Sequence, residues 1–488
     1  MRVPLPAAFW FPGLQSSLRC LAFCFLMPAS SIGQAPTPLR LQQRALDLQV
    51  SLDYPRERLE GIARLTLENA GNAPVRRVPL LLNRLMLFRT VTDGSGQALR
   101  FSERVVRFAD DPKRQVDFAE VALPRPLDPG SRTELVVHYD GNLVGYVETG
   151  SLYVRDRIDT SFTILRTDAY AFPVIGWPDW RLNRGAPTAP FAFHLAITVP
   201  EDLVAVTGGR RLAERRSNGR VTWEYASTEA VPFLNIAVAP YVAVGQRGIE
   251  AYVFPSDSLA ARGVIAKAEQ ALDSLSRWFG PLDSAPRVTV IEIPPGYGSQ
   301  ASLSAGIIID AAAFRDASRL HELYHELSHF WNPRDTATPS PRVTEGLASL
   351  LEQRLAAALD GRTGLDSLLE ARVARLRARA VTDSALRQVP MRAYGSADRT
   401  GLAYPVGMLL FHSLQQCLGT AAFDALWGDY LSKTRKTGGS DEDFAAFAIR
   451  QTGNPAVREL FETWLFTTRW IERLSAGEPL AALRRGCG

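Results

Sequence analysis

Hydrophobic and polar residues alternate through much of the first half of the chain. Runs of this kind occur in residues 46–52, 63–67, 135–139, 191–199 and 221–225. Clusters of Gly, Pro and Asn separate the runs, and successive side chains of a strand point to opposite faces. The pattern therefore predicts strands that each bury one face, and we expect residues 36–245 to form an N-terminal antiparallel β-sandwich domain.

The pattern changes about halfway along the chain. Hydrophobic residues recur at helical spacing over residues 265–279, and Gly280 favours the end of this helix. Short strands are expected at residues 287–293 and 305–310, and almost everything after them has a helical pattern. We therefore expect residues 246–488 to form a second, α+β domain whose C-terminal part is helical.

The first residues of the chain have the features of a secretory signal peptide. Arg19 precedes a short apolar run at residues 20–27, and the small residues Ser31 and Gly33 precede a possible cleavage site. The apolar run is far shorter than the roughly 18 residues that a membrane-spanning helix needs. We expect residues 1–33 to be a signal peptide and the mature protein to be periplasmic or extracellular, with no membrane span.

Composition and charge are those of an ordinary globular protein. Hydrophobic residues make up 46% of the 488 residues and charged residues 22%, which excludes disorder or a fibrous fold for the whole chain. The net charge of +4 does not indicate a nucleic-acid partner. Without the signal peptide only Cys417 and Cys487 remain, which are too few for a Cys-rich zinc site but could form a disulfide.

The sequence LHELYHELSHFW, residues 320–331, contains three of the six histidines of the chain. Histidines four residues apart project from one face of a helix, so a pair of them can bind one metal ion. A Glu that follows the first His of such a pair lies beside the metal, where it can take a proton from water. The sequence therefore predicts a metal site on an amphipathic helix.

Two overlapping patterns compete for this site. One uses His321 and His325 with Glu322, and the other uses His325 and His329 with Glu326. All three histidines cannot bind one ion, because a rise of about 1.5 Å per residue separates the outer two by two helical turns.

A third ligand is expected from the sequence VTEGLASLLE. Glu345 stands near the start of this predicted helix, and Glu352 follows two turns later on the same face. A carboxylate in the position of Glu352 can accept a hydrogen bond from a ligating histidine. Two His and one Glu would leave one coordination position open, which is typical of a catalytic zinc site. We expect one Zn²⁺ per chain.

The pair HELSHFW and TEGLASLLE resembles the signature of the gluzincin metallopeptidases of the aminopeptidase N and leukotriene hydrolase family. The resemblance implies that His325, His329 and Glu345 are the ligands, that Glu326 is the general base and that Glu352 orients a ligand. Fifteen residues separate His329 from Glu345 here, against eighteen in the family. The other pattern leaves nineteen, but its flanking residues match poorly.

The resemblance extends over most of the chain. The β half, notably LEGIARLTLENAGNAPV, is similar to the saddle-shaped sandwich of that family, which implies a thermolysin-like, mostly helical catalytic domain after it. The segment LAYPVGMLLFHSLQQCLG is similar to the family's Tyr-x-x-Gly helix. Tyr404 would then be the tyrosine that stabilises the tetrahedral intermediate, whereas without the resemblance the pattern favours a packing residue before a helix.

One segment departs from the family. The exopeptidases carry Gly-x-Met-Glu-Asn, whose Glu binds the free amino terminus of the substrate. The corresponding stretch here is QASLSAGIIID, and alignment on Gly306 places Leu303 where the family has that Glu. The strand can still bind a peptide backbone by strand addition, with Ser304, Ala305 and Gly306 as the substrate-binding residues.

Taken together, these features predict an exported zinc-dependent metallopeptidase that acts on peptides or proteins and is aminopeptidase-like, with the amine-binding Glu lost. The sequence HFWN at residues 329–332 also resembles the glycyl aminopeptidases, which are the nearest alternative family. The alternative function is that of a catalytically inactive binding or scaffold protein with the same fold.

Overall fold

The computed structural model describes residues 40–143, 157–179, 190–282, 287–295, 300–302, 306–337, 339–479 and 482. These residues belong to one compact unit, Leu39–Gly488. The expected signal peptide lies outside the described residues. Cys417 is disulfide-bonded, and its expected partner, Cys487, also lies outside the described residues.

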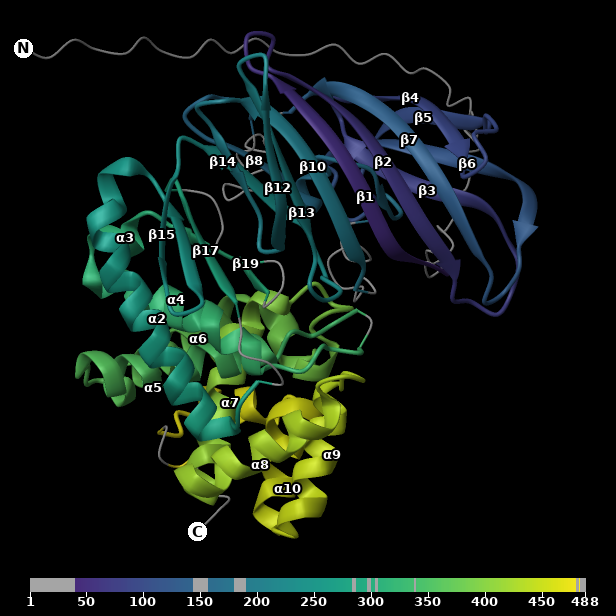
Figure 1. The fold of residues 1–488 in the computed structure, drawn as a ribbon. Helices are drawn as coiled ribbons and strands as arrows, with labels where there is room; N and C mark the ends of the chain where they lie inside the picture. Colours follow the sequence, from purple (N-terminus) through teal and green to yellow (C-terminus); the bar gives the residue numbers. More distant parts are fainter. Residues whose placement is uncertain are drawn as a thin grey trace, which may run out of the picture. The chain divides into compact units, whose positions relative to one another are not determined.

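Two facing sheets form the predicted β-sandwich (Figure 1). The larger sheet has the strand order β12 (Arg210–Ser217), β13 (Arg220–Ala226), β10 (Ala192–Pro200), β1 (Leu41–Asp53), β2 (Arg58–Asn69), β7 (Arg132–Asn142) and β4 (Met86–Asp93). The smaller sheet has the order β5 (Phe101–Arg107), β6 (Gln115–Leu127), β3 (Val75–Asn83) and β9 (Val174–Ile175). Leu48 and Leu65 of the first sheet share one buried cluster with Leu80 and Val121 of the second.

The sandwich is confirmed, but it is not antiparallel throughout. Strands β1 and β10 run parallel, with Leu48 opposite Leu195, whereas the other neighbours in the two sheets are antiparallel. Parallel neighbours need a long connection, and here the chain passes through most of the sandwich before it returns beside β1. Alternation of side chains predicts which face is buried and does not predict which strand lies alongside.

A third and a fourth sheet connect the sandwich to the helical half of the chain. The third has the order β11 (Val204–Val206), β14 (Asn235–Ala239) and β8 (Thr163–Arg166). The fourth is mixed, with the order β15 (Val242–Gln246), β16 (Ile249–Val253), β17 (Val288–Ile293), β19 (Gly306–Asp310) and β18 (Gln300–Ser302). Ile164 and Ala237 of the third sheet share a buried cluster with Tyr252, Ile291 and Ile308 of the fourth. The expected domain boundary at 245 falls inside β15, which pairs with β16.

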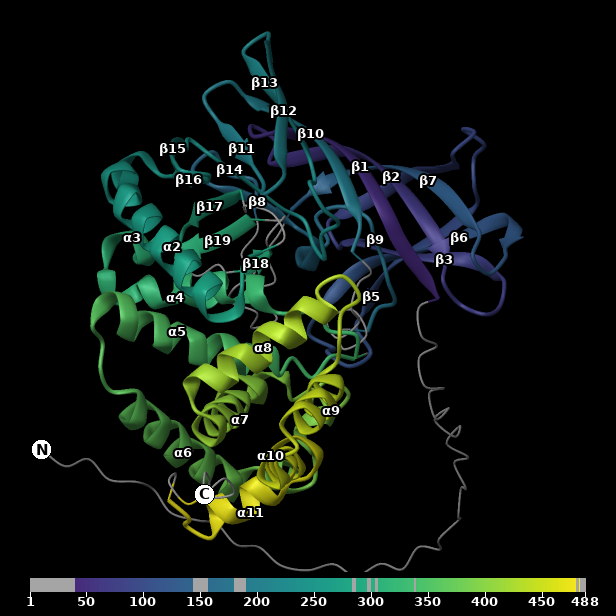
Figure 2. The same cartoon turned by 60° about the horizontal axis from the view of Figure 1, so that its bottom comes forward.

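Helix α2 (Ser258–Phe279) lies between β16 and β17 along the chain, and the other helices come after β19. They are α3 (Ala312–Arg315), α4 (Leu320–Ser328), α5 (Thr344–Asp360), α6 (Leu365–Thr382), α7 (Ala403–Leu418), α8 (Thr420–Thr434), α9 (Asp441–Thr452), α10 (Pro455–Phe461) and α11 (Arg469–Ser475). Helix α2 packs on β15 and β16, α4 packs near β18 and β19, and α5 lies between α4 and α7 (Figure 2). This layering places the helix that carries the histidines between the mixed sheet and the C-terminal helices.

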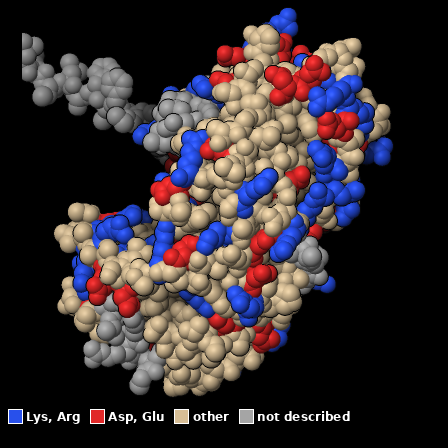
Figure 3. Space-filling model, turned by 60° about the vertical axis from the view of Figure 1, so that its left-hand side comes forward, with Lys and Arg blue, Asp and Glu red and all other residues tan. Residues whose placement is uncertain are grey.

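The face of the molecule in Figure 3 carries Lys and Arg side chains next to Asp and Glu side chains. Ion pairs such as Arg44–Glu68 and Arg132–Glu68 reflect this mixing of charge. Among the helices within the described residues, none combines the length and the apolar character that crossing a bilayer requires.

A buried carboxyl group lies where the mixed sheet meets the start of α2. Glu292 of β17 is fully buried, and its Oε2 accepts a hydrogen bond from the backbone N–H of Phe254 at 2.7 Å. Asp257 binds the guanidinium of Arg315, which lies 3.9 Å from Glu292 Oε1. Burial raises the pKa of Glu292 to about 8.

We predict that Glu292 makes the protein less stable as the pH rises from 5 to 8. The folded state holds the proton of this carboxyl up to about pH 8, whereas the unfolded chain loses it near pH 4.3. The free energy of unfolding should therefore fall over this range by roughly 1–3 kcal/mol more in the wild type than in Glu292→Gln. Urea unfolding at a series of pH values measures the difference, and parallel curves for the two proteins would contradict it.

Candidate metal centre

The histidine-rich segment forms α4 and a short 3₁₀ turn, His329–Trp331, that continues it. Its apolar side chains pack into the largest hydrophobic core, as expected for an amphipathic helix; they are Leu320, Leu323, Leu327 and Phe330. Because these residues hold one side of the segment in the core, His325 and His329 project together from another side. The geometry of the site therefore begins with the amphipathic pattern of this one helix.

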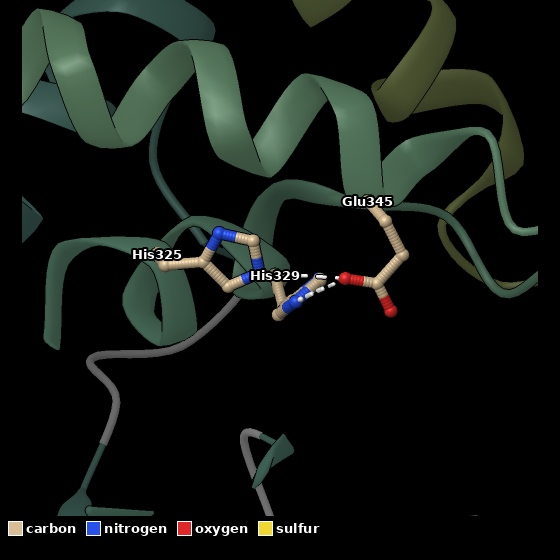
Figure 4. Close-up of side chains that lie close together, drawn as sticks. All are labelled: His325, His329 and Glu345. Atoms are coloured by element: carbon tan, nitrogen blue, oxygen red, sulfur yellow. Dashed lines mark hydrogen bonds and ion pairs between the residues drawn. The ribbon is translucent and has the colours of Figure 1, made fainter. Parts of the chain in front are cut away.

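Three candidate ligands converge on one point (Figure 4). His325, His329 and Glu345 each offer one ligand atom, and the three atoms lie within 4.8 Å of one another. Glu345 Oε2 is 3.3 Å from His325 Nε2 and 3.4 Å from His329 Nε2. Two imidazole nitrogens and one carboxylate oxygen are a donor set that zinc prefers, so the residues present fit a zinc ion.

His321 lies outside this group and binds a different carboxylate. Its Nδ1 is 2.9 Å from Glu352 Oε1, while Glu352 Oε2 is 3.3 Å from His325 Nδ1. Burial opposes ionisation of Glu352, but the hydrogen bonds from His321 and His325 prevail and lower its pKa to about 2. An ionised Glu352 holds the proton of His325 on Nδ1, and this leaves Nε2 free to bind a metal.

Asn332 contacts His329 at Nδ1, the same ring atom at which Glu352 contacts His325. Its amide nitrogen is 3.0 Å from His329 Nδ1, and its buried amide oxygen has no hydrogen-bond partner among the described residues. The two ends of an amide are assigned from their hydrogen bonds. Turning this amide gives the oxygen a partner, because it then accepts a hydrogen bond from His329 Nδ1–H, and His329 Nε2 is left free for a metal.

Glu326 and Tyr404 are the other two residues that the sequence singled out for catalysis. Glu326 lies between His325 and His329 in the sequence, and its side chain is buried. Burial raises the pKa of its carboxyl group, while His329 and His325 oppose the rise. The ring of Tyr404 stacks on that of His325, with 6.0 Å between centroids and 11° between planes. Burial and then the charge of Glu345 raise the pKa of Tyr404, so its phenol remains a hydrogen-bond donor at neutral pH.

Two glycines set the spacing between Glu345 and Tyr404. Helices α5 and α7 cross at Gly346 and Gly407, which follow these two residues by one and three positions. A Cβ atom on Gly346 would overlap the backbone of Gly407, and one on Gly407 would lie 2.9 Å from Val343 O. The absence of side chains at both positions lets the helices approach closely and brings the carboxylate and the phenol to the same site.

The predicted substrate-binding strand is described only in part. Gly306 begins β19 with a φ of 81°, and a Cβ atom there would lie 3.2 Å from Thr289 O. Ser304 and Ala305, like Leu303, lie outside the described residues. Their expected role in binding substrate therefore stays a prediction.

The sequence did not single out Arg342. Its guanidinium contacts Glu345 Oε1, and its backbone has a φ of 59°, in the left-handed region. No motif marks this residue, because the backbone conformation that turns it towards Glu345 arises from the loop before α5.

Comparison with known proteins identifies the fold. No family model and no curated protein matches the sequence. The chain is similar to an M1 zinc metallopeptidase from Deinococcus radiodurans, with 22% identity and a TM-score of 0.63. A mutant of that metallopeptidase bound to a Tyr-Ser-Ala substrate gives a TM-score of 0.64 at 22% identity. Each comparison covers 86% of this chain and 93% of the other. The chain therefore has the fold of M1 zinc metallopeptidases, and the fold implied by the resemblance to gluzincins is confirmed.

We predict that Gly407→Ala disturbs the site through the helix crossing. The added methyl group would push α7 away from α5, at a cost of about 1–3 kcal/mol in the free energy of unfolding. Gly401→Ala is the matched control, because no atom lies within 4 Å of a Cβ at that position. Thermal unfolding and the zinc content of the purified proteins measure the effect, and equal values for the two variants would refute it.

Proposed function

We propose that this protein is a zinc-dependent, aminopeptidase-like metallopeptidase that hydrolyses peptide bonds of peptides or proteins. The observation that carries the proposal is the convergence of His325, His329 and Glu345 within the fold of M1 zinc metallopeptidases. One Zn²⁺ per chain would be held by these residues and would supply Lewis acidity, which activates water and polarises a carbonyl group.

The remaining residues of the site supply the proton transfers and the hydrogen bonds. Glu326 takes a proton from the attacking water and passes it to the leaving amine, a task for which a buried carboxyl with a raised pKa is suited. The Tyr404 hydroxyl donates a hydrogen bond to the oxygen on which negative charge develops. Glu352 keeps His325 in the tautomer that binds metal. Gly306, with Ser304 and Ala305, pairs with the substrate backbone.

We further propose the domain limits and the location that the sequence suggests. Residues 1–33 act as a signal peptide, residues 36–245 form the sandwich domain and residues 246–488 form the thermolysin-like catalytic domain. Export to the periplasm or the extracellular space rests on Arg19 and the apolar run that follows it.

We predict that Glu326→Gln binds zinc and does not cleave peptides. The amide has nearly the same size as the carboxyl group but cannot accept the proton of water, so kcat/KM should fall by about 10²–10⁴-fold. Metal analysis and cleavage assays on the wild type and the variant test this expectation. Equal activity would overturn the role of Glu326. A wild type that binds zinc without cleaving any peptide would favour the inactive binding protein instead.

We predict that blocking the amino terminus of a substrate has little effect on cleavage. Leu303 cannot pair with an ammonium group, so Tyr-Ser-Ala, which binds the D. radiodurans mutant, and its N-acetyl form should have kcat/KM values within about tenfold. Leu303→Glu restores a carboxylate and should favour the free amine. Cleavage of the free peptide alone by the wild type would show that another group recognises the amino terminus.

A further inference from the structure

Arg342 occupies a strained backbone conformation immediately before α5. Its φ of 59° lies in the left-handed region, which is unfavourable for a residue with a side chain. Such strain persists only where the surrounding structure determines it, and it is concentrated at functional sites. The position three residues before Glu345 makes this arginine a candidate for a role at the metal centre.

A chain of hydrogen bonds holds the loop in this conformation. The Asp335 carboxylate accepts from the backbone N–H of Ala337 at 2.8 Å and contacts the Ser340 hydroxyl. Ser340 Oγ in turn accepts from the backbone N–H of Arg342 at 3.0 Å. The carbonyl of Arg342 accepts from the N–H of Glu345 at 3.1 Å, which begins the helix. Arg342 is thus fixed on both sides, and its side chain is directed by a structured loop.

The two carboxylate oxygens of Glu345 have different partners. The guanidinium of Arg342 contacts Oε1, whereas Oε2 faces His325 Nε2 and His329 Nε2. The Arg342 side chain is 33% exposed, so it remains in contact with solvent. The oxygen that accepts from the guanidinium is a weaker metal ligand, so this contact favours Oε2 as the ligand atom.

We propose that Arg342 positions Glu345 so that it binds the metal through Oε2 alone. This inference rests on the proposed zinc site. Each of the three ligands then has one residue that orients it: Glu352 for His325, Asn332 for His329 and Arg342 for Glu345. Binding through a single oxygen preserves the open coordination position on which hydrolysis depends.

A guanidinium near a metal also acts through its positive charge. Alignment of the ligand and repulsion by the charge change the metal affinity in opposite directions. As a positioning group, Arg342 strengthens metal binding because it keeps Glu345 aligned. As a positive charge alone, it would repel a divalent cation and weaken binding. Arg342→Lys retains the charge without the planar fork, and Arg342→Met removes both. The pair of variants therefore separates alignment from charge.

The experiment compares the wild type, Arg342→Lys, Arg342→Met and the control Arg354→Met. Arg354 is an arginine of α5 that also binds a carboxylate, since it donates two hydrogen bonds of 2.7 and 2.8 Å to Asp424. Zinc affinity is measured by competition with a chromogenic chelator, and the visible absorption of the Co²⁺-loaded proteins reports the coordination number. Both Arg342 variants should bind zinc about 10–100-fold more weakly. Their Co²⁺ forms should absorb less visible light per metal ion, because Glu345 Oε1, no longer held by Arg342, binds as a fifth ligand atom. Arg354→Met should lose stability but keep both metal properties.

Several outcomes would overturn the proposal. Unchanged affinity and absorption in both Arg342 variants would show that the contact has no effect on the ligand. Tighter zinc binding by Arg342→Met with wild-type binding by Arg342→Lys would show that charge alone acts. Failure of the wild type to bind zinc would defeat this proposal and the proposed function together. Zinc binding with the expected variant effects but without peptide cleavage would defeat only the proposed function.

Discussion

The buried negative charge of Glu345 is the constraint around which the centre is built. A carboxylate removed from water is costly unless opposite charges and hydrogen bonds compensate for it. Burial alone would raise the pKa of Glu345, but His329, Arg342 and His325 prevail and hold it well below the ordinary value. The group stays ionised because three elements bring compensating side chains to it: α4, the turn after α4, and the loop before α5.

Close packing of helices turns this balance of charge into a defined geometry. The apolar face of α4 fixes the direction of the histidines, and the crossing at Gly346 and Gly407 fixes the distance between α5 and α7. Glu345 and Tyr404 stand within one helical turn of this crossing. Close packing in a protein interior permits little movement, so the hydrophobic residues around the site fix the positions of its polar side chains.

The sequence predicted the features that depend on local periodicity. Histidines four residues apart share a face of any α-helix, and alternation along β2 and β13 indicates which side chains are buried. Features that depend on distant partners were not predictable in this way. The parallel pairing of β1 with β10 depends on the path of the whole chain. The contact of Arg342 with Glu345 depends on a positive φ at Arg342, which is held by the hydrogen bond from its N–H to Ser340 Oγ and by that of the Ser340 hydroxyl to Asp335.

The cluster shared by the third and fourth sheets has a practical consequence for protein engineering. Ile291 and Ile308 on the mixed sheet are covered by Ile164 and Ala237, which come from the first half of the chain. A shortened protein that began at residue 246 would leave these side chains uncovered, and it would lack most of β15, which pairs with β16. Such a fragment would be prone to aggregate during expression, so a minimal soluble version should retain β8, β11 and β14.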